Sequence, residues 1–179
     1  VDAIATLQDC IERAGALHRQ HPEETSALRL QVAARGHLAQ ALAATGRSAE
    51  SRGCIESALP DLGALRAASD GNGLDVLEAA RLADLGIESA DDPARAIDSF
   101  DRSLLAWQRA LDHAPADARL LAEAARCLAL RGEAFTRQNR LGEAAASLDQ
   151  AVAKLQAVPD PAPDGVREQL AVAQWARAG

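Results

Sequence analysis

The side chains around residues 18–24 are the first in the sequence with the types and spacing for metal chemistry. His18 and His21 stand three residues apart, which lets two imidazoles on one helix share a metal ion, and Glu23 and Glu24 follow them. Pro22 interrupts the helix, because proline lacks a backbone donor and clashes with the preceding turn. No third ligand has a familiar metal-site spacing. We therefore interpret these residues as a solvated helix end and predict no metal site.

The stretch DGNGLD, residues 70–75, alternates oxygen-bearing side chains in the manner of a calcium loop. A helix–loop–helix calcium site needs oxygen ligands at several alternate positions and a glutamate at the twelfth. Leu74 occupies one of those ligand positions, and the twelfth residue is Arg81. The stretch is therefore predicted to be a flexible loop between two helices.

No sequence motif of a common enzyme or cofactor class is present. The chain has no G-x-S-x-G, phosphate-binding loop or dinucleotide fingerprint. Cys10, Cys54 and Cys127 are odd in number, widely spaced and without a C-x-x-C pair, so we expect reduced, buried thiols, with a redox or metal role as the alternative. The prediction is a protein with no catalytic residue and no cofactor.

The composition predicts an all-α protein. Ala and Leu supply most of the 48% hydrophobic content, with two Phe, two Trp and no Tyr or Met. Residues that favour strands are scarce, whereas strong helix formers are abundant. The net charge of −7 is spread over both signs, which argues against nucleic-acid binding. No apolar run could span a membrane, so we expect a cytoplasmic protein, and the missing initiator Met suggests a piece of a longer chain.

Helical periodicity and breaks predict about eight helices. Their approximate ranges are 2–20, 23–46, 47–68, 74–86, 93–114, 118–139, 141–157 and 164–178. Glu23 and Glu24 are expected in the first turn of the second helix, where the helix dipole favours anions. Pro60 is expected to kink or split the third helix. Asp92 is expected to cap the fifth, with Pro93 at its first position.

An internal repeat organises these helices. Three second helices carry a small, a bulky and a small residue at i, i+4 and i+7. The sets are Ser51-Ile55-Ala58, Ala96-Phe100-Ser103 and Ala144-Leu148-Ala151, with a weaker echo at Ala3-Leu7-Cys10. The first helices align as AQALAATG (39–46), AARLADLG (79–86) and GEAFTRQN (132–139). Each segment ends on Gly or Asn, which tolerate a left-handed helix end.

The repeat has a packing explanation that requires no chemistry. Two antiparallel helices approach closely only where their side chains are small. Gly132 and Ala144 are predicted to provide that room, and Phe135 and Leu148 to fill the space beside it. Repetition lets each hairpin bury its exposed face on the next one.

This pattern resembles the tetratricopeptide repeat (TPR). The resemblance rests on the small residue and the Leu or aromatic of the first helix, the Gly/Asn turn, and the small–bulky–small second helix. It is best over residues 118–153, fair over 28–62 and loose over 74–104. The repeat here is 45–48 residues rather than the usual 34, as in long-helix TPR arrays of bacterial multidomain signalling proteins. The resemblance implies a right-handed superhelix of antiparallel helix pairs, an α-α solenoid.

We expect the repeat array to cover residues 1–158, with a linker and a C-terminal capping helix over 159–179. Trp175 is expected to pack that last helix against the array, and an exposed anchor for a partner is the alternative for it.

The resemblance also implies a binding surface, because the concave face of TPR arrays takes peptides. The residues expected there are His37, Gln40, Asp84, Arg126, Glu133 and Arg137. Arg126 and Arg137 are eleven residues apart on one helix face and are predicted to clamp a carboxylate; the alternative is two solvated arginines. Binding to chaperone tails is not supported, since the lysines and asparagines that grip them are replaced, for example by Ala129 and Leu130.

The sequence therefore predicts a non-catalytic scaffold module that binds a partner protein or peptide, without nucleic acid or membrane insertion. Three alternatives stay open. The chain could be a regulatory or dimerisation region of a larger signalling enzyme such as a bacterial serine/threonine kinase. It could instead be a small helical enzyme or a ligand-binding bundle. Self-association also stays open.

Overall fold

The computed structural model describes residues 3–68, 73–159 and 165, and within them the chain is all-helical with seven helices and no strand. The helices are α1 (Ala3–Gln20), α2 (Thr25–Ala44), α3 (Ser48–Ala68), α4 (Leu74–Glu88), α5 (Pro93–His113), α6 (Ala118–Arg137) and α7 (Leu141–Gln156). None of these helices is both long and apolar enough to cross a membrane. The predicted eighth helix at 164–178, with Trp175, lies outside the described residues.

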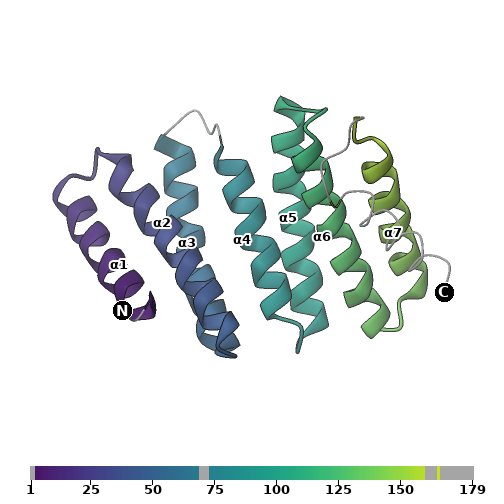
Figure 1. Ribbon diagram of the computed structural model, residues 1–179, viewed down its shortest axis with the longest axis horizontal. Helices are drawn as coiled ribbons and strands as arrows, with labels where there is room; N and C mark the ends of the chain where they lie inside the picture. Colours follow the sequence, from purple (N-terminus) through teal and green to yellow (C-terminus); the bar gives the residue numbers. More distant parts are fainter. Residues whose placement is uncertain (1–2, 69–72, 160–164, 166–179) are drawn as a thin grey trace. The chain divides into compact units, whose positions relative to one another are not determined.

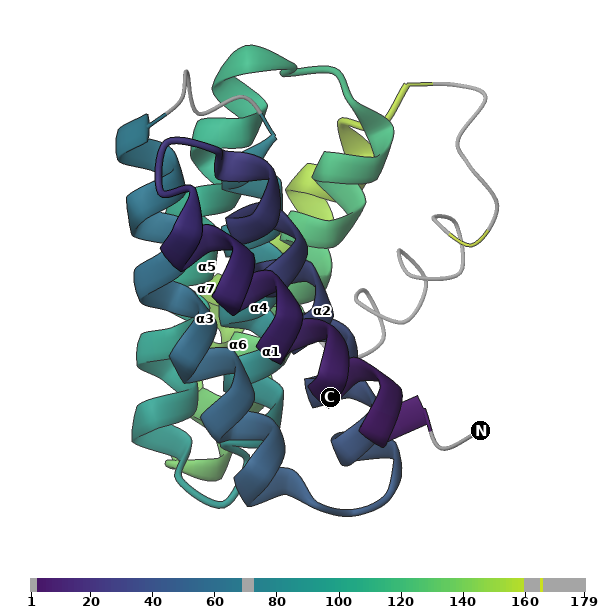
Figure 2. The ribbon, with the colours of Figure 1, turned by 90° about the vertical axis from the view of Figure 1, so that its left-hand side faces the viewer.

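The chain divides into two compact units, residues 1–74 and residues 75–179. In the first, α1 packs on α2 and α2 packs on α3, and successive helices run in opposite directions (Figures 1 and 2). In the second, α4 to α7 also alternate in direction, with α5 packed on α6 and α6 on α7 (Figure 1). Each unit is therefore a series of antiparallel helix hairpins.

Local sequence signals account for several helix boundaries. Asp92 caps α5 by accepting a hydrogen bond from the Arg95 backbone N–H, and Pro93 opens the helix. Asp117 caps α6 in the same way. Gly46 and Asn139 follow α2 and α6 with positive φ angles of 76° and 59°, as the turn residues of the repeat predicted. These sites confirm that capping and left-handed ends set the helix lengths here.

Three local predictions differ from the structure in part or in full. Of the predicted kink or split at Pro60, the split does not occur, because α3 is continuous through it; Pro60 is exposed, so water can bond the carbonyl that loses its partner. Glu23 and Glu24 precede α2 rather than lying in its first turn, and Glu24 makes no side-chain cap. Gly86 does not end α4, which continues to Glu88.

Gly86 instead marks a close approach between α4 and α5. A Cβ atom there would lie 2.5 Å from Cε1 of Phe100, so the aromatic ring occupies the space that a side chain would take. One turn further along α5, the Ser103 hydroxyl donates a 2.7 Å hydrogen bond to the backbone oxygen of Ala79. The small residues of the repeat thus let the aromatic ring and the serine hydroxyl reach the backbone of α4.

The small–bulky–small sets behave largely as predicted. Ser51, Ile55 and Ala58 are at most 1% exposed. In the third set Ala144 and Ala151 are buried and Leu148 is partly buried. A Cβ atom at Gly132 would lie 3.4 Å from both the Ala144 oxygen and Leu148 Cγ, which confirms the predicted approach. The echo at Ala3-Leu7-Cys10 is not buried.

We predict that Gly86→Ala lowers the free energy of unfolding, whereas Gly132→Ala changes it little. Alanine raises helix propensity by about 1 kcal/mol at either position. At Gly86 the methyl group displaces Phe100, and overpacking of this kind costs about 1–3 kcal/mol. Urea unfolding monitored by circular dichroism measures both. Equal stability of the two variants would contradict the close approach at Gly86.

Candidate functional site

The residues predicted for partner binding lead to a group of charged side chains on α4 and α6. We call it the α4–α6 charge cluster, and its members are Arg81, Asp84, Glu88, Glu123 and Arg126. Spacings of three, four and seven residues place Arg81, Asp84 and Glu88 on one face of α4. The charges of Glu123 and Arg126 act on the Asp84 carboxylate, so the α6 residues lie close to it. The structure thus brings predicted residues Asp84 and Arg126 together.

Arg81 is the least satisfied member of this cluster. Its side chain is 11% exposed, and Nη1 lies 3.2 Å from Oδ2 of Asp84. That contact lacks the geometry of a hydrogen bond, so Nε and Nη1 of Arg81 and Oδ2 of Asp84 are buried without a hydrogen-bond partner. A buried donor or acceptor left without a partner costs about 1–3 kcal/mol, and more when charged. Nη1 and Oδ2 compensate each other's charge in the ion pair, whereas Nε has no hydrogen-bond partner among the described residues.

Asp84 also has an altered acidity. Burial raises the pKa of its carboxyl group above the ordinary value of 3.8, while the positive charges of Arg81 and Arg126 oppose that rise. The folded state therefore binds this proton more tightly than the unfolded chain. It follows that the contribution of Asp84 to stability falls as the pH rises through the window between 3.8 and the raised pKa.

The two arginines of the predicted clamp each face an acid of α6 in the structure. Arg126 pairs with Glu123 on its own helix, and Arg137 lies 3.9 Å from Glu133. Arg137 also donates a 3.5 Å hydrogen bond to the Ala90 backbone oxygen. Arg81, which lies one turn from Asp84, is the cation that the sequence interpretation missed.

The remaining predicted residues, His37 and Gln40, are exposed on α2 in the first unit. Neither takes part in a charged cluster among the described residues. A polar contact between two helices of that unit comes instead from Arg35, which donates hydrogen bonds to the Asp61 carboxylate and the Ser57 carbonyl. Arg35 therefore joins α2 to α3, and sequence periodicity alone gave no signal for that role.

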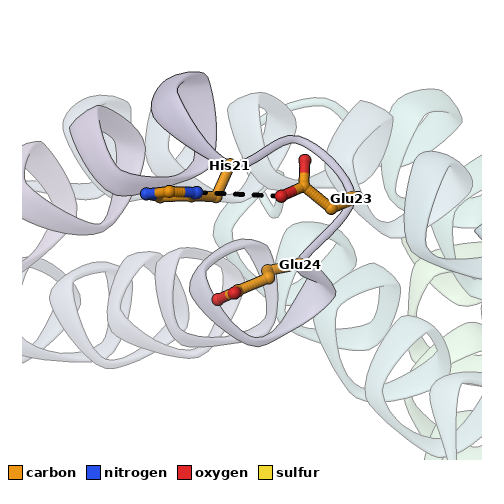
Figure 3. A group of neighbouring side chains, drawn as sticks. All are labelled: His21, Glu23 and Glu24. Carbon is orange, nitrogen blue, oxygen red and sulfur yellow. Dashed lines mark ion pairs between the residues drawn. The ribbon is translucent and has the colours of Figure 1, made fainter.

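His21, Glu23 and Glu24 lie together in the turn between α1 and α2 (Figure 3). Their ligand atoms all lie within 4.8 Å of one another, and His21 Nδ1 is 3.7 Å from Glu23 Oε1. All three side chains are exposed. His18 lies apart from this group, partly buried, and its Nδ1 has no hydrogen-bond partner. Structural zinc sites enclose the ion with four ligands, so we interpret the group as an exposed ion-pairing turn.

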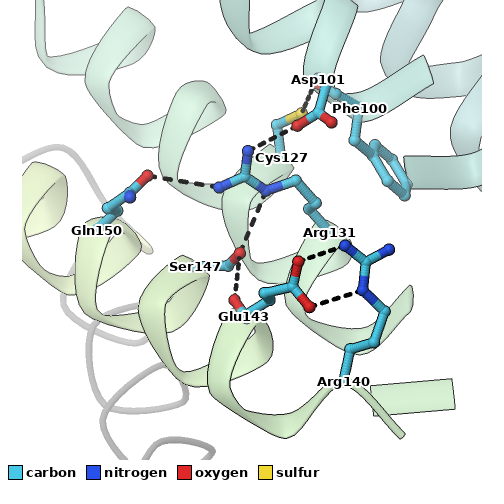
Figure 4. Close-up of polar contacts among 8 residues, drawn as sticks. All are labelled: Phe100, Asp101, Cys127, Arg131, Arg140, Glu143, Ser147 and Gln150. Atoms are coloured by element: carbon cyan, nitrogen blue, oxygen red, sulfur yellow. Dashed lines mark hydrogen bonds and ion pairs between the residues drawn. The ribbon is translucent and has the colours of Figure 1, made fainter. Parts of the chain in front are cut away.

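Arg131 is the centre of a second polar network, which has a structural explanation (Figure 4). From α6 it donates to Asp101 on α5, at 2.7 Å, and to Ser147 and Gln150 on α7. Its side chain is 17% exposed. Each of its three nitrogens donates one hydrogen bond, and this guanidinium therefore joins three helices.

All three cysteines are free thiols, but only Cys127 is buried as predicted, whereas Cys10 and Cys54 are partly exposed. Burial raises the pKa of Cys127 to about 11, and its Sγ donates a 3.7 Å hydrogen bond to the Phe100 backbone oxygen. Burial also raises the pKa of Cys54. Because the thiolate is the reactive form, neither of these two thiols is activated as a nucleophile at neutral pH.

Comparison with known proteins adds no identity to this geometry. No model of a protein family matches the chain, and no curated protein is detectably similar to it in sequence. The α4–α6 charge cluster must therefore be interpreted from its own contacts.

We predict that Arg81→Gln raises the pKa of Asp84 further, because it removes the positive charge that opposes the effect of burial. Glu88→Gln should lower that pKa, since the Glu88 charge raises it. The carboxyl carbon shift of Asp84, followed by NMR during a pH titration, measures both changes. An unchanged pKa in Arg81→Gln would show that the two side chains do not interact as described.

Proposed function

We propose that the chain is a non-catalytic protein-interaction module that binds a segment of a partner protein over the α4–α6 charge cluster. The observation that carries this proposal is the Arg81–Asp84 ion pair, in which Nη1 and Oδ2 lie 3.2 Å apart without a hydrogen bond and Nε of Arg81 has no hydrogen-bond partner. An extended peptide offers a backbone carbonyl and an N–H side by side. It can therefore accept a hydrogen bond from Arg81 and donate one to Asp84.

A TPR-like architecture is part of the same proposal. It is supported by the alternating helix directions within each unit, the buried small residues of the repeat and the Gly46 and Asn139 turns. In such a solenoid of antiparallel helix pairs, α4 and α6 are the first helices of their pairs. First helices line the concave face in TPR proteins, and this is the face that takes peptides.

The described residues also favour binding over catalysis. The charge cluster holds no thiol, hydroxyl or amine nucleophile, and burial raises the pKa of the Cys54 and Cys127 thiols, which disfavours the reactive thiolate. Asp84 is held next to Arg81 in an ion pair, which is suited to recognising a polar group. A scaffold role uses these features without a further reacting group.

Affinity capture from a cell lysate with a matched pair of variants tests the proposal. Arg126→Glu reverses an exposed charge in the cluster, and Arg102→Glu reverses one on α5. The two arginines are alike: their side chains are 58% and 50% exposed, and each faces an acid of its own helix at 3.7 and 3.8 Å. We expect Arg126→Glu to lose a partner that the wild type and Arg102→Glu retain.

Arg81→Gln should weaken capture of the same partner about tenfold. A hydrogen bond to a charged group contributes about 1.5–3 kcal/mol, and about 1.4 kcal/mol corresponds to a factor of ten. Its retained helicity, measured by circular dichroism, controls for misfolding. A partner captured equally by the wild type and by both cluster variants would refute binding at this face.

A further inference from the structure

Helix α1 carries a stripe of five apolar or small residues. They are spaced by four, three, four and three residues, which places them along one face of the helix. The first three form the weak echo of the repeat, and the spacing continues it by two more. We call this the α1 stripe, and its members are Ala3, Leu7, Cys10, Ala14 and Leu17.

The α1 stripe is largely open, whereas the matching stripe of α3 is closed. In α1 only Ala14 is buried; Leu7 and Cys10 are partly buried and Ala3 is exposed. Leu17 is 45% exposed. The five residues of α3 in the same register are at most 4% exposed, and they are Ser51, Ile55, Ala58, Leu62 and Leu65. The α1 stripe therefore has the pattern of a covered helix face without the full cover.

Helix α2 packs on a different side of α1. A Cβ atom at Gly15 would lie 2.8 Å from Nε2 of Gln31 in α2, so Gly15 faces that helix. Leu17 follows two residues later, which is about 200° around the helix. Leu17 thus points away from α2, in agreement with its exposure, and the outer part of the stripe is accessible to another helix.

The order of side-chain sizes along the α1 stripe complements its own reverse. From Ala3 onward it runs small, bulky, Cys, small, bulky, so an antiparallel second copy presents bulky, small, Cys, bulky, small. With Cys10 on a two-fold axis, Ala3 faces Leu17 of the second copy and Leu7 faces its Ala14. Each contact occurs twice in such an interface. The same small-against-bulky contact closes the helix hairpins of the repeat.

The charges beside the stripe are compatible with this pairing. Arg13 borders the stripe on one side, and antiparallel packing about Cys10 sets it opposite Thr6 of the second copy. On the other side His18 comes opposite Ile4. The pairing therefore brings no like charges together along these rows, and like charges facing each other would oppose it.

We propose that α1 pairs with α1 of a second copy of this chain in an antiparallel, two-fold contact centred on Cys10. One helix of each copy, over about 21 Å of stripe, places the contact at the small end of protein interfaces. The dimer is therefore weak and depends on protein concentration. It uses no residue of the α4–α6 charge cluster, so its test is independent of the proposed function.

Sedimentation equilibrium of the full chain tests the pairing with two matched variants. Leu17→Glu sets a carboxylate on the α1 stripe and Leu30→Glu sets one on α2, and these leucines are 45% and 52% exposed. We expect the wild type and Leu30→Glu to dimerise alike. Leu17→Glu should raise the dissociation constant at least about tenfold, because the contact would bury an unpaired charge. Circular dichroism checks that both variants fold.

An exchange of sizes tests the register. Leu17→Ala should weaken the dimer, and adding Ala3→Leu should restore it, because the new leucine faces the new alanine of the second copy. Adding Ala5→Leu instead should not restore it, since Ala5 is also exposed on α1 but lies off the stripe. A wild type that stays monomeric at millimolar concentration, an undiminished dimer in Leu17→Glu, or equal rescue by the two leucines would each overturn the proposal.

Discussion

Close approach of helix backbones is the constraint on which the rest of this structure depends. The chain has two Phe, two Trp and no Tyr or Met, so large side chains cannot fill wide gaps between helices. Helices lined by Ala, Ser and Gly must instead come near one another to bury enough apolar surface. Phe100 over Gly86, Ser103 on Ala79 and Leu148 by Gly132 are the points where this occurs.

Close packing also decides what the arginines do. Long side chains lie at the edges of each helix contact, and where an acid stands across the contact they join the two helices. Arg109 of α5 bonds Asp75 and Glu78 of α4 at 2.8 and 2.7 Å, and Arg131 joins α6 to its neighbours. Arg81 has an acid on its own helix and no bonded acceptor for Nε or Nη1. That contrast between bonded and unbonded guanidinium groups is the basis of the proposed function.

The sequence predicted the helices well because their signals are local. Asp92 with Pro93, Gly46 and Asn139 each fix a boundary through their own backbone or side-chain chemistry. Gly86 misled the prediction because a glycine that ends a helix and one that admits a neighbouring ring look alike in one sequence. Only the position of Phe100 across the contact distinguishes them.

The candidate site was predicted in part. Asp84 and Arg126 were predicted from the resemblance to TPR proteins, whose first helices line the concave face. Arg81 was not predicted, because its importance comes from its burial and from its missing hydrogen-bond partners rather than from its spacing. An unmet hydrogen bond is a property of the packed structure, and no local pattern encodes it.

The most direct test of the central claim is site-specific photocrosslinking in source cells. A photoreactive amino acid at position 126 would mark whatever lies over the α4–α6 charge cluster, and the same probe at position 102 serves as the control. The account predicts a crosslinked partner protein at 126 and none at 102. No crosslink at 126, or the same products at both positions, would contradict it.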